Sequence, residues 1–141
     1  MERDPLQGHQ VVCSAFIEKD HKVLIGMYTR FKVWRVPGGR PEYEEKIEDT
    51  LIRELQEETG IHFVDPKFLG WGQDQQLHVR GQMLTSRLIM FFYVKTDAEI
   101  QLDPGEAEDS KWVTIEELKQ IENKEGALTD FFERNLEFNI L

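Results

Sequence analysis

The sequence has a single cysteine, Cys13, no long apolar run and no leader-like start. One cysteine cannot form a disulfide within the chain, which is typical of proteins from a reducing cytoplasm. A membrane-spanning helix needs about 20 consecutive apolar residues, and no stretch approaches that length. Residues 1–5 also lack the basic and apolar regions of a signal peptide. These absences predict a cytoplasmic protein with no membrane partner.

Positive charge is scarce as well. The chain has 17 Lys and Arg against 27 Asp and Glu, a formal net charge of −10, and its basic residues form no run. Binding to a nucleic-acid polymer depends largely on a basic face that neutralises phosphates. A polymeric nucleic acid is therefore not expected as a partner.

What is present fits one globular domain. The chain has 141 residues, of which 40% are hydrophobic and 31% charged, and it shows no repeat and no linker. This length and composition are enough to bury a core and are unlike those of disordered chains. We expect a single domain over residues 1–141. The sequence leaves the oligomeric state open and allows a homodimer.

The most informative segment runs from residue 39 to residue 61 and reads G-x5-E-x7-R-E-U-x-E-E-x-G-U, where U is a bulky apolar residue. Its fixed positions are all occupied, by Gly39, Glu45, Arg53, Glu54, Leu55, Glu57, Glu58, Gly60 and Ile61. With average residue usage, chance would produce this match on the order of once in ten million chains of this size.

Most of this segment is predicted to form one helix. Residues 46–59 contain no Gly or Pro, and Ile47, Leu51 and Leu55 recur every four residues as an apolar stripe. Gly60 stands where a left-handed C-terminal cap is expected. The helical period places the carboxylates of Glu54, Glu57 and Glu58 within an arc of about 100° beside that stripe.

Like charges at this spacing destabilise a helix, and a low-dielectric apolar flank strengthens the repulsion. A solvated acidic face is the plainest interpretation, but a divalent cation would remove the repulsion directly. Ligands that are all oxygen favour Mg²⁺, with Mn²⁺ as the alternative. The spacing therefore predicts a metal site at Glu54, Glu57 and Glu58.

A glycine pair precedes the helix, in Val36-Pro37-Gly38-Gly39-Arg40-Pro41. We expect a strand end followed by a turn that only glycines adopt freely. Two glycines there would let a backbone carbonyl approach a metal or a phosphate closely.

The full pattern resembles the Nudix box, the signature of the Nudix hydrolases. The resemblance implies that Gly39 offers its carbonyl to the metal, that Arg53 orients neighbouring glutamates and that Glu45 has a supporting role. It also implies a pyrophosphate-binding platform formed by the loop and helix, to which Gly38, Gly39 and Arg40 belong. Several family members carry another acidic ligand or base before a later tryptophan-bearing strand. Glu106 or Glu108 would match it here, with Glu106 preferred and an exposed acidic loop as the plain alternative.

The rest of the chain reads as alternating strands and helices. Expected strands cover residues 11–18, 22–28, 33–36, 67–73, 83–95 and 111–113, with helices from Thr114 and over residues 128–135. Helices on both sides of a mixed sheet form an α/β/α sandwich, which is also the Nudix fold. Phe31 is a candidate for stacking on a substrate base. Arg30 and Arg35 could contact phosphate, although solvated arginines are the commoner case.

These features predict a metal-dependent hydrolase of a nucleoside diphosphate linked to another group. Glu57 and Glu58 are the expected direct ligands, and Glu54 is either a third ligand or the base that accepts the proton of water. The preferred substrate is a nucleoside triphosphate, modified ones included, cleaved to monophosphate and pyrophosphate. ADP-ribose and nucleotide sugars are the alternatives. A non-catalytic nucleotide-sensing module is the alternative of another class.

Overall fold

The computed structural model describes residues 9–28, 32–62, 64–77 and 84–140. Phe31 and Arg30, two of the candidate substrate contacts, lie outside these residues. Within them no helix combines the length and apolar character needed to cross a bilayer. The elements in chain order are β1 Gln10–Lys19, β2 Lys22–Tyr28, β3 Val33–Arg35, β4 Gly38–Gly39, α1 Ile47–Thr59, β5 Lys67–Leu77, β6 Leu84–Lys95, β7 Asp109–Val113, α2 Ile115–Gln120 and α3 Gly126–Arg134.

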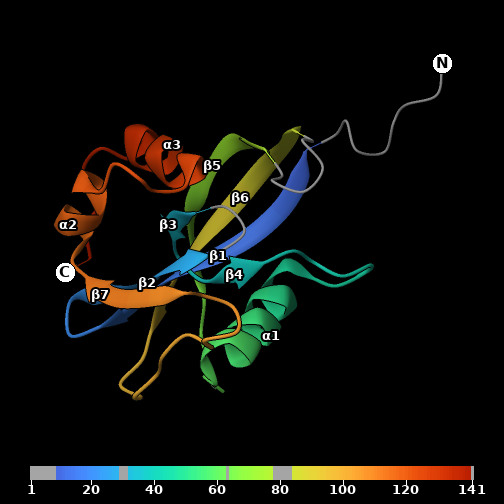
Figure 1. Cartoon of the computed structure of the whole chain (residues 1–141). Helices are drawn as coiled ribbons and strands as arrows, with labels where there is room; N and C mark the ends of the chain where they lie inside the picture. Colours follow the sequence, from blue (N-terminus) through green and yellow to red (C-terminus); the bar gives the residue numbers. More distant parts are fainter. Residues whose placement is uncertain (1–8, 29–31, 63, 78–83, 141) are drawn as a thin grey trace.

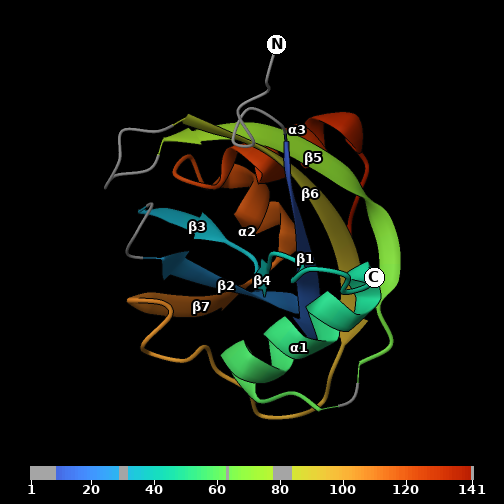
Figure 2. The ribbon, with the colours of Figure 1, turned by 90° about the vertical axis from the view of Figure 1, so that its right-hand side faces the viewer.

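The strands form one mixed seven-stranded sheet in the order β3-β2-β1-β6-β5, with β4 paired to β1 and β7 to β2. Strands β1 and β6 run parallel, and the other pairs are antiparallel. Strands β1 and β2 pair only at Glu18–Val23 and Lys19–Lys22, next to their tight turn. Beyond that point they diverge, and β4 takes the place of β2 beside β1 (Figure 2).

The sheet carries helices on both faces, with α1 on one and α2 and α3 on the other (Figure 1). Strand β1 explains why, because its side chains alternate between two cores. Val12 and Phe16 pack with residues of α2 and α3, whereas Cys13, Ala15 and Ile17 pack with Leu51 and Leu55 of α1. The predicted α/β/α sandwich with a mixed sheet is confirmed.

Most predicted elements occur within a few residues of their expected bounds. Thr114 forms the expected capping box with Glu117 at the start of α2. Strand β5 is longer than expected and continues to Leu77, and α3 begins two residues early, at Gly126. Strand β7 begins at Asp109, because its first residues pair with Met27 and Gly26 of β2.

The prediction of a glycine turn at Gly38 and Gly39 was wrong. The two residues form a short strand, β4, opposite Ser14 and Cys13, and neither has a positive φ. The requirement for glycine is steric instead. A Cβ at Gly38 would collide with the Cys13 carbonyl oxygen and lie 2.6 Å from Ser14 Cα, so only glycine allows β4 to lie this close to β1.

Candidate active site

Helix α1 presents its acidic side to β4 because its apolar side is committed to the sheet. Thr50, Leu51 and Leu55 are buried, and the helix ends at Gly60, whose φ of 77° is the left-handed conformation expected for this cap. Glu54 and Glu58 therefore lie between the helix and the glycine strand, whereas Glu57 is exposed and contacts Arg53.

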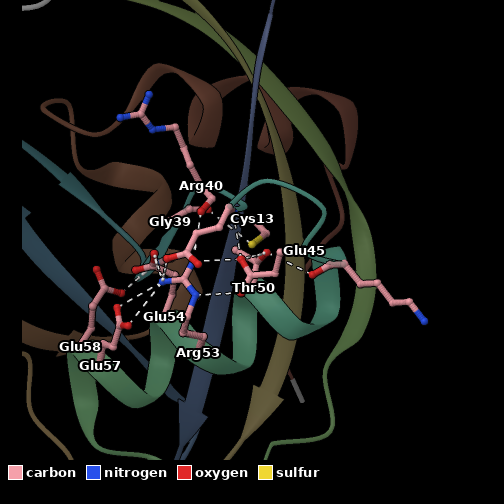
Figure 3. Close-up of polar contacts among 12 residues, drawn as sticks. Cys13, Gly39, Arg40, Glu45, Thr50, Arg53, Glu54, Glu57 and Glu58 are labelled. Atoms are coloured by element: carbon pink, nitrogen blue, oxygen red, sulfur yellow. Dashed lines mark hydrogen bonds and ion pairs between the residues drawn. The ribbon is translucent and has the colours of Figure 1, made fainter.

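Arg53 is the centre of this acidic side (Figure 3). Its Nε and Nη2 donate to the two carboxylate oxygens of Glu45, at 2.8 and 3.0 Å. Its Nη1 donates to Glu54 at 3.0 Å and to Glu57 at 3.3 Å, and Nη2 also reaches the carbonyl oxygen of Arg40. All three guanidinium nitrogens are thus directed at protein oxygens, and Arg53 holds three glutamates in a fixed relation.

Glu45 anchors this arrangement from the start of the helix. It accepts hydrogen bonds from Thr50 Oγ1 at 2.6 Å and from the Glu42 N–H at 3.0 Å, in addition to those from Arg53. These bonds lower the pKa of Glu45 to about 2, and the bond from Arg53 has the largest effect. Glu45 is therefore ionised over the whole working range and is saturated by protein donors.

Glu54 lies against the glycine strand. A Cβ at Gly39 would stand 2.5 and 2.6 Å from its two carboxylate oxygens, so a side chain at position 39 would displace Glu54. Partial burial raises the pKa of Glu54, and the nearby charges of Glu57 and Glu106 act in the same direction against Arg53. Close contact between Gly39 and this carboxylate is the structural reason for the second glycine.

Glu58 is the most enclosed of the three glutamates, with only 3% of its surface exposed. Its Oε2 accepts the Gly38 N–H at 2.9 Å, and its Oε1 lies 3.5 Å from the donating Tyr28 hydroxyl. Burial raises the pKa of Glu58 to about 8; the charges of Glu54 and Glu106 add to this effect, while Arg35 opposes it. Burial is therefore the main reason that ionised Glu58 is disfavoured in the metal-free site.

We expect the raised pKa of Glu58 to affect the stability of the metal-free protein. Below a pH of about 4.5 Glu58 is protonated in both the folded and unfolded states, whereas between about 4.5 and about 8 only the unfolded state ionises. Rising pH across this window therefore lowers the free energy of unfolding, by roughly 1.4 kcal/mol per unit of pKa shift. Glu58→Gln, which cannot ionise, should lose less stability.

The measurement is the melting temperature in EDTA from pH 5 to pH 9. At pH 8 Glu58→Gln should melt several degrees above the unaltered protein, with the two curves converging near pH 5. Glu57→Gln is the control, because 58% of the Glu57 side chain is exposed. Parallel curves for Glu58→Gln and the unaltered protein would show that Glu58 is ionised when buried.

Of the two acidic residues considered in the loop before β7, Glu106 is the one whose charge acts on the cluster. It raises the pKa values of Glu54 and Glu58. Glu108 instead forms an ion pair with Lys32 at 2.9 Å. A ligand or base role for Glu106 stays a prediction, whereas Glu108 is already engaged with a lysine.

The expected substrate contacts have different surroundings. The Gly38 N–H is bound to Glu58, and its carbonyl oxygen accepts from Arg35 at 3.4 Å. The Arg40 side chain extends away from Arg53 and donates to Gln10 at 2.9 Å (Figure 3). From the sequence, Arg35 was a possible phosphate contact, with a solvated side chain as the commoner alternative. Its position immediately before buried Val36, on a strand that leads into the glycines, was the available signal.

The donor set fits a hard divalent cation in its chemistry. Carboxylates of Glu54, Glu57 and Glu58 and the Gly39 carbonyl are all oxygen ligands, which Mg²⁺ and Mn²⁺ prefer. The raised pKa values of Glu54 and Glu58 indicate that added positive charge would stabilise the ionised cluster. Among the described residues, no three or more His, Cys, Asp or Glu side chains are grouped so that they could hold a metal ion as they stand. Glu54 and Glu57 are held by Arg53 instead.

Comparisons with known proteins agree with this geometry. The family model described as "NUDIX domain" matches residues 8–134. A protein of Bacillus subtilis (strain 168), named as the uncharacterized Nudix hydrolase YvcI, is 29% identical over 126 residues, which cover 86% of this chain and 78% of that protein.

Two solved structures share the fold. The MutT protein from Methanosarcina mazei Go1 has a TM-score of 0.76 at 22% identity, covering 89% of this chain and 91% of the other. A bifunctional NMN adenylyltransferase/ADP ribose pyrophosphatase from Francisella tularensis, complexed with AMP and a manganese ion, has a TM-score of 0.66 at 19% identity. That match covers 95% of this chain and 43% of the larger protein.

Proposed function

The chain belongs to the Nudix hydrolase family, and we propose that it cleaves the phosphoanhydride bond of a nucleoside triphosphate, modified ones included, to a monophosphate and pyrophosphate. That it is a Nudix pyrophosphohydrolase follows from the family. The triphosphate and the residue roles are our proposals. The observation that supports them most is the pairing of a glycine strand with three glutamates on one helix. Two of these, Glu54 and Glu58, have pKa values raised by burial first and by neighbouring carboxylates as well.

We propose Mg²⁺ as the cofactor, with Mn²⁺ as the alternative, held by Glu57, Glu58 and the Gly39 carbonyl. Glu54 and Glu106 are further candidate ligands. When bound, the cation would neutralise the substrate phosphates and the charge that develops during hydrolysis. Nudix hydrolases generally need a divalent metal, and the structurally similar Francisella protein was crystallised with manganese. The acidic protein needs such a bridge, because its net charge of −10 would otherwise repel the substrate.

In this proposal the chain's own residues position the substrate and move the proton. Water attacks one phosphorus of the bridge, and Glu54 is the candidate to accept its proton. The pKa of Glu54 is raised, and a carboxylate with a higher pKa is a stronger base for accepting a proton from water. Arg53 fixes the direction of Glu54 and Glu57 through the bonds described above. Gly39 leaves the space that the Glu54 carboxylate occupies.

Two alternatives remain proposals of lower rank. ADP-ribose or a nucleotide sugar is supported by the name of the Francisella relative in fold, an ADP ribose pyrophosphatase bound to AMP. A non-catalytic nucleotide-sensing module would be favoured by loss of motif glutamates. None is lost here, since Glu54, Glu57 and Glu58 are all present.

A substrate panel tests the proposal. We expect nucleoside triphosphates to be hydrolysed faster than ADP-ribose, nucleotide sugars and dinucleotides with long polyphosphate bridges, because the described site has few cations for distant phosphates. Released phosphate is measured after addition of pyrophosphatase for the triphosphates, or of phosphatase for the conjugates. Fastest turnover of ADP-ribose or of a long-bridged dinucleotide would overturn this ranking. No turnover across the panel would favour the sensing module.

A further inference from the structure

The cations around the glutamate cluster differ in how many of their donors the protein already uses. Arg53 directs all three of its nitrogens at carboxylate or carbonyl oxygens. Lys32 is paired with Glu108, and Arg40 donates to Gln10. These contacts leave Arg53 and Lys32 with little capacity for an added anion. Arg35 and Arg40 keep most of their N–H groups unused among the described residues, and of the two Arg35 is the one that contacts Tyr28 and Gly38 beside Glu58.

Arg35 makes one hydrogen bond to the described residues, from Nη2 to the Gly38 carbonyl at 3.4 Å, which is near the limit for such a bond. It forms no ion pair with a described carboxylate within 4.0 Å. Its buried Nε has no partner, whereas Nη1 is not among the enclosed unpartnered atoms. A guanidinium has five N–H donors, so most of those on Arg35 are unused.

The location of Arg35 is also specific. It is the last residue of β3 and pairs with Gly26 of β2. Its guanidinium carbon lies 4.1 Å from the centre of the Tyr28 ring. Tyr28 in turn contacts Glu58, and Arg35 bonds the same Gly38 whose N–H holds Glu58. The aromatic ring and the carbonyl orient the guanidinium at the edge of the glutamate cluster, where its charge opposes part of the rise in the pKa of Glu58.

We propose that Arg35 binds a phosphate oxygen of the nucleotide held at this cluster. The inference rests on the proposed function, since it needs a phosphorylated substrate there. A preoriented planar guanidinium with free N–H groups matches the bidentate geometry of phosphate recognition. It forms no ion pair within 4.0 Å with a described carboxylate, so a phosphate of the substrate can supply that anion. Arg35 thereby recognises the phosphate chain and leaves selection of the base to other residues.

The first test compares Arg35→Met with the unaltered protein in steady-state hydrolysis of the best substrate of the panel. Loss of one charged phosphate contact should raise KM about 10- to 100-fold, with a much smaller change in kcat. Arg35→Lys keeps the charge but loses the planar fork and should fall between the two. Arg134→Met is the matched control, because Arg134 also stacks on an aromatic ring, Trp71, at 3.8 Å, but on α3 away from the cluster.

The second test measures binding without turnover. Inorganic pyrophosphate with Mg²⁺ is titrated calorimetrically into each protein, and Arg35→Met should bind it about 10- to 100-fold more weakly than Arg134→Met does. Melting temperatures of the variants accompany both tests. A purely structural role for Arg35 would lower the melting temperature and kcat while leaving KM and pyrophosphate affinity unchanged.

The outcomes separate the two proposals. Failure of the unaltered protein to hydrolyse any compound of the panel would contradict the proposed function. Hydrolysis by the unaltered protein, together with an unchanged KM and an unchanged pyrophosphate affinity in Arg35→Met, would overturn the role of Arg35 alone. Equal weakening in Arg35→Met and Arg134→Met would also overturn it, because the effect would not be local to the cluster.

Discussion

Excess EDTA is expected to abolish hydrolysis, and Mg²⁺ or Mn²⁺ should restore it. The described site surrounds Glu54 and Glu58 with further carboxylates, and the pKa of both is raised. A substrate with several negative charges would meet this cluster in a protein of net charge −10. Without an added cation, both the ionised glutamates and the phosphates would repel one another at short range.

The measurement is initial rate against free metal concentration, with the melting temperature recorded in parallel. A cation that binds only the folded protein should raise the melting temperature as its concentration increases. Stabilisation by Mg²⁺ should be larger at pH 8 than at pH 5, because protonation of Glu58 competes with the metal. A circular dichroism spectrum in EDTA is the control, because an unchanged spectrum shows that the protein has lost activity without unfolding. Full turnover in excess EDTA would contradict the metal-dependent mechanism.

Replacing Glu57 or Glu58 by glutamine is expected to reduce turnover by roughly 10²–10⁴-fold, the range for loss of a positioned catalytic group. Glutamine keeps the size of the side chain and removes its charge. In Glu58→Gln the amide oxygen can still accept the Gly38 N–H, so the fold should persist. Glu57 is exposed, and among the described residues it is bonded only to Arg53, so its replacement should leave β4 undisturbed.

Glu48→Gln provides the matched control, because Glu48 is an exposed glutamate in the first turn of the same helix. It should retain normal turnover, which would exclude a general effect of charge on α1. Near-normal rates in both Glu57→Gln and Glu58→Gln would show that these residues are not the metal-binding glutamates. A lost melting transition in either variant would instead show that the cluster is structural.

The helix and its acidic side were predictable because they depend on contacts close in sequence. The apolar period of Ile47, Leu51 and Leu55 and the left-handed cap at Gly60 are set within a few turns. The strands and the two-faced sandwich were predictable for a similar reason, since alternation along β1 supplies a core on each side of the sheet.

The role of the glycines and the differences among the glutamates were not predictable in this way. Gly38 looked like a turn residue because only its neighbours in sequence were visible, yet its constraint comes from β1, more than twenty residues earlier. Glu57 and Glu58 are adjacent in sequence, but one is exposed and the other buried against Gly38 and Tyr28. The contacts of Arg35 with Tyr28 of β2 and Gly38 of β4 likewise depend on how separate strands lie together.

By itself, the sequence determined the family, the acidic helix and the oxygen-rich chemistry of the site, because a complete motif and a local period carry that information. Only the tertiary structure decided which carboxylate is desolvated, which arginine is saturated and which retains unused donors. Those properties depend on how β2, β3 and β4 lie against α1. Burial and donor satisfaction arise from contacts between segments distant in the chain, and residue spacing within one segment does not encode them.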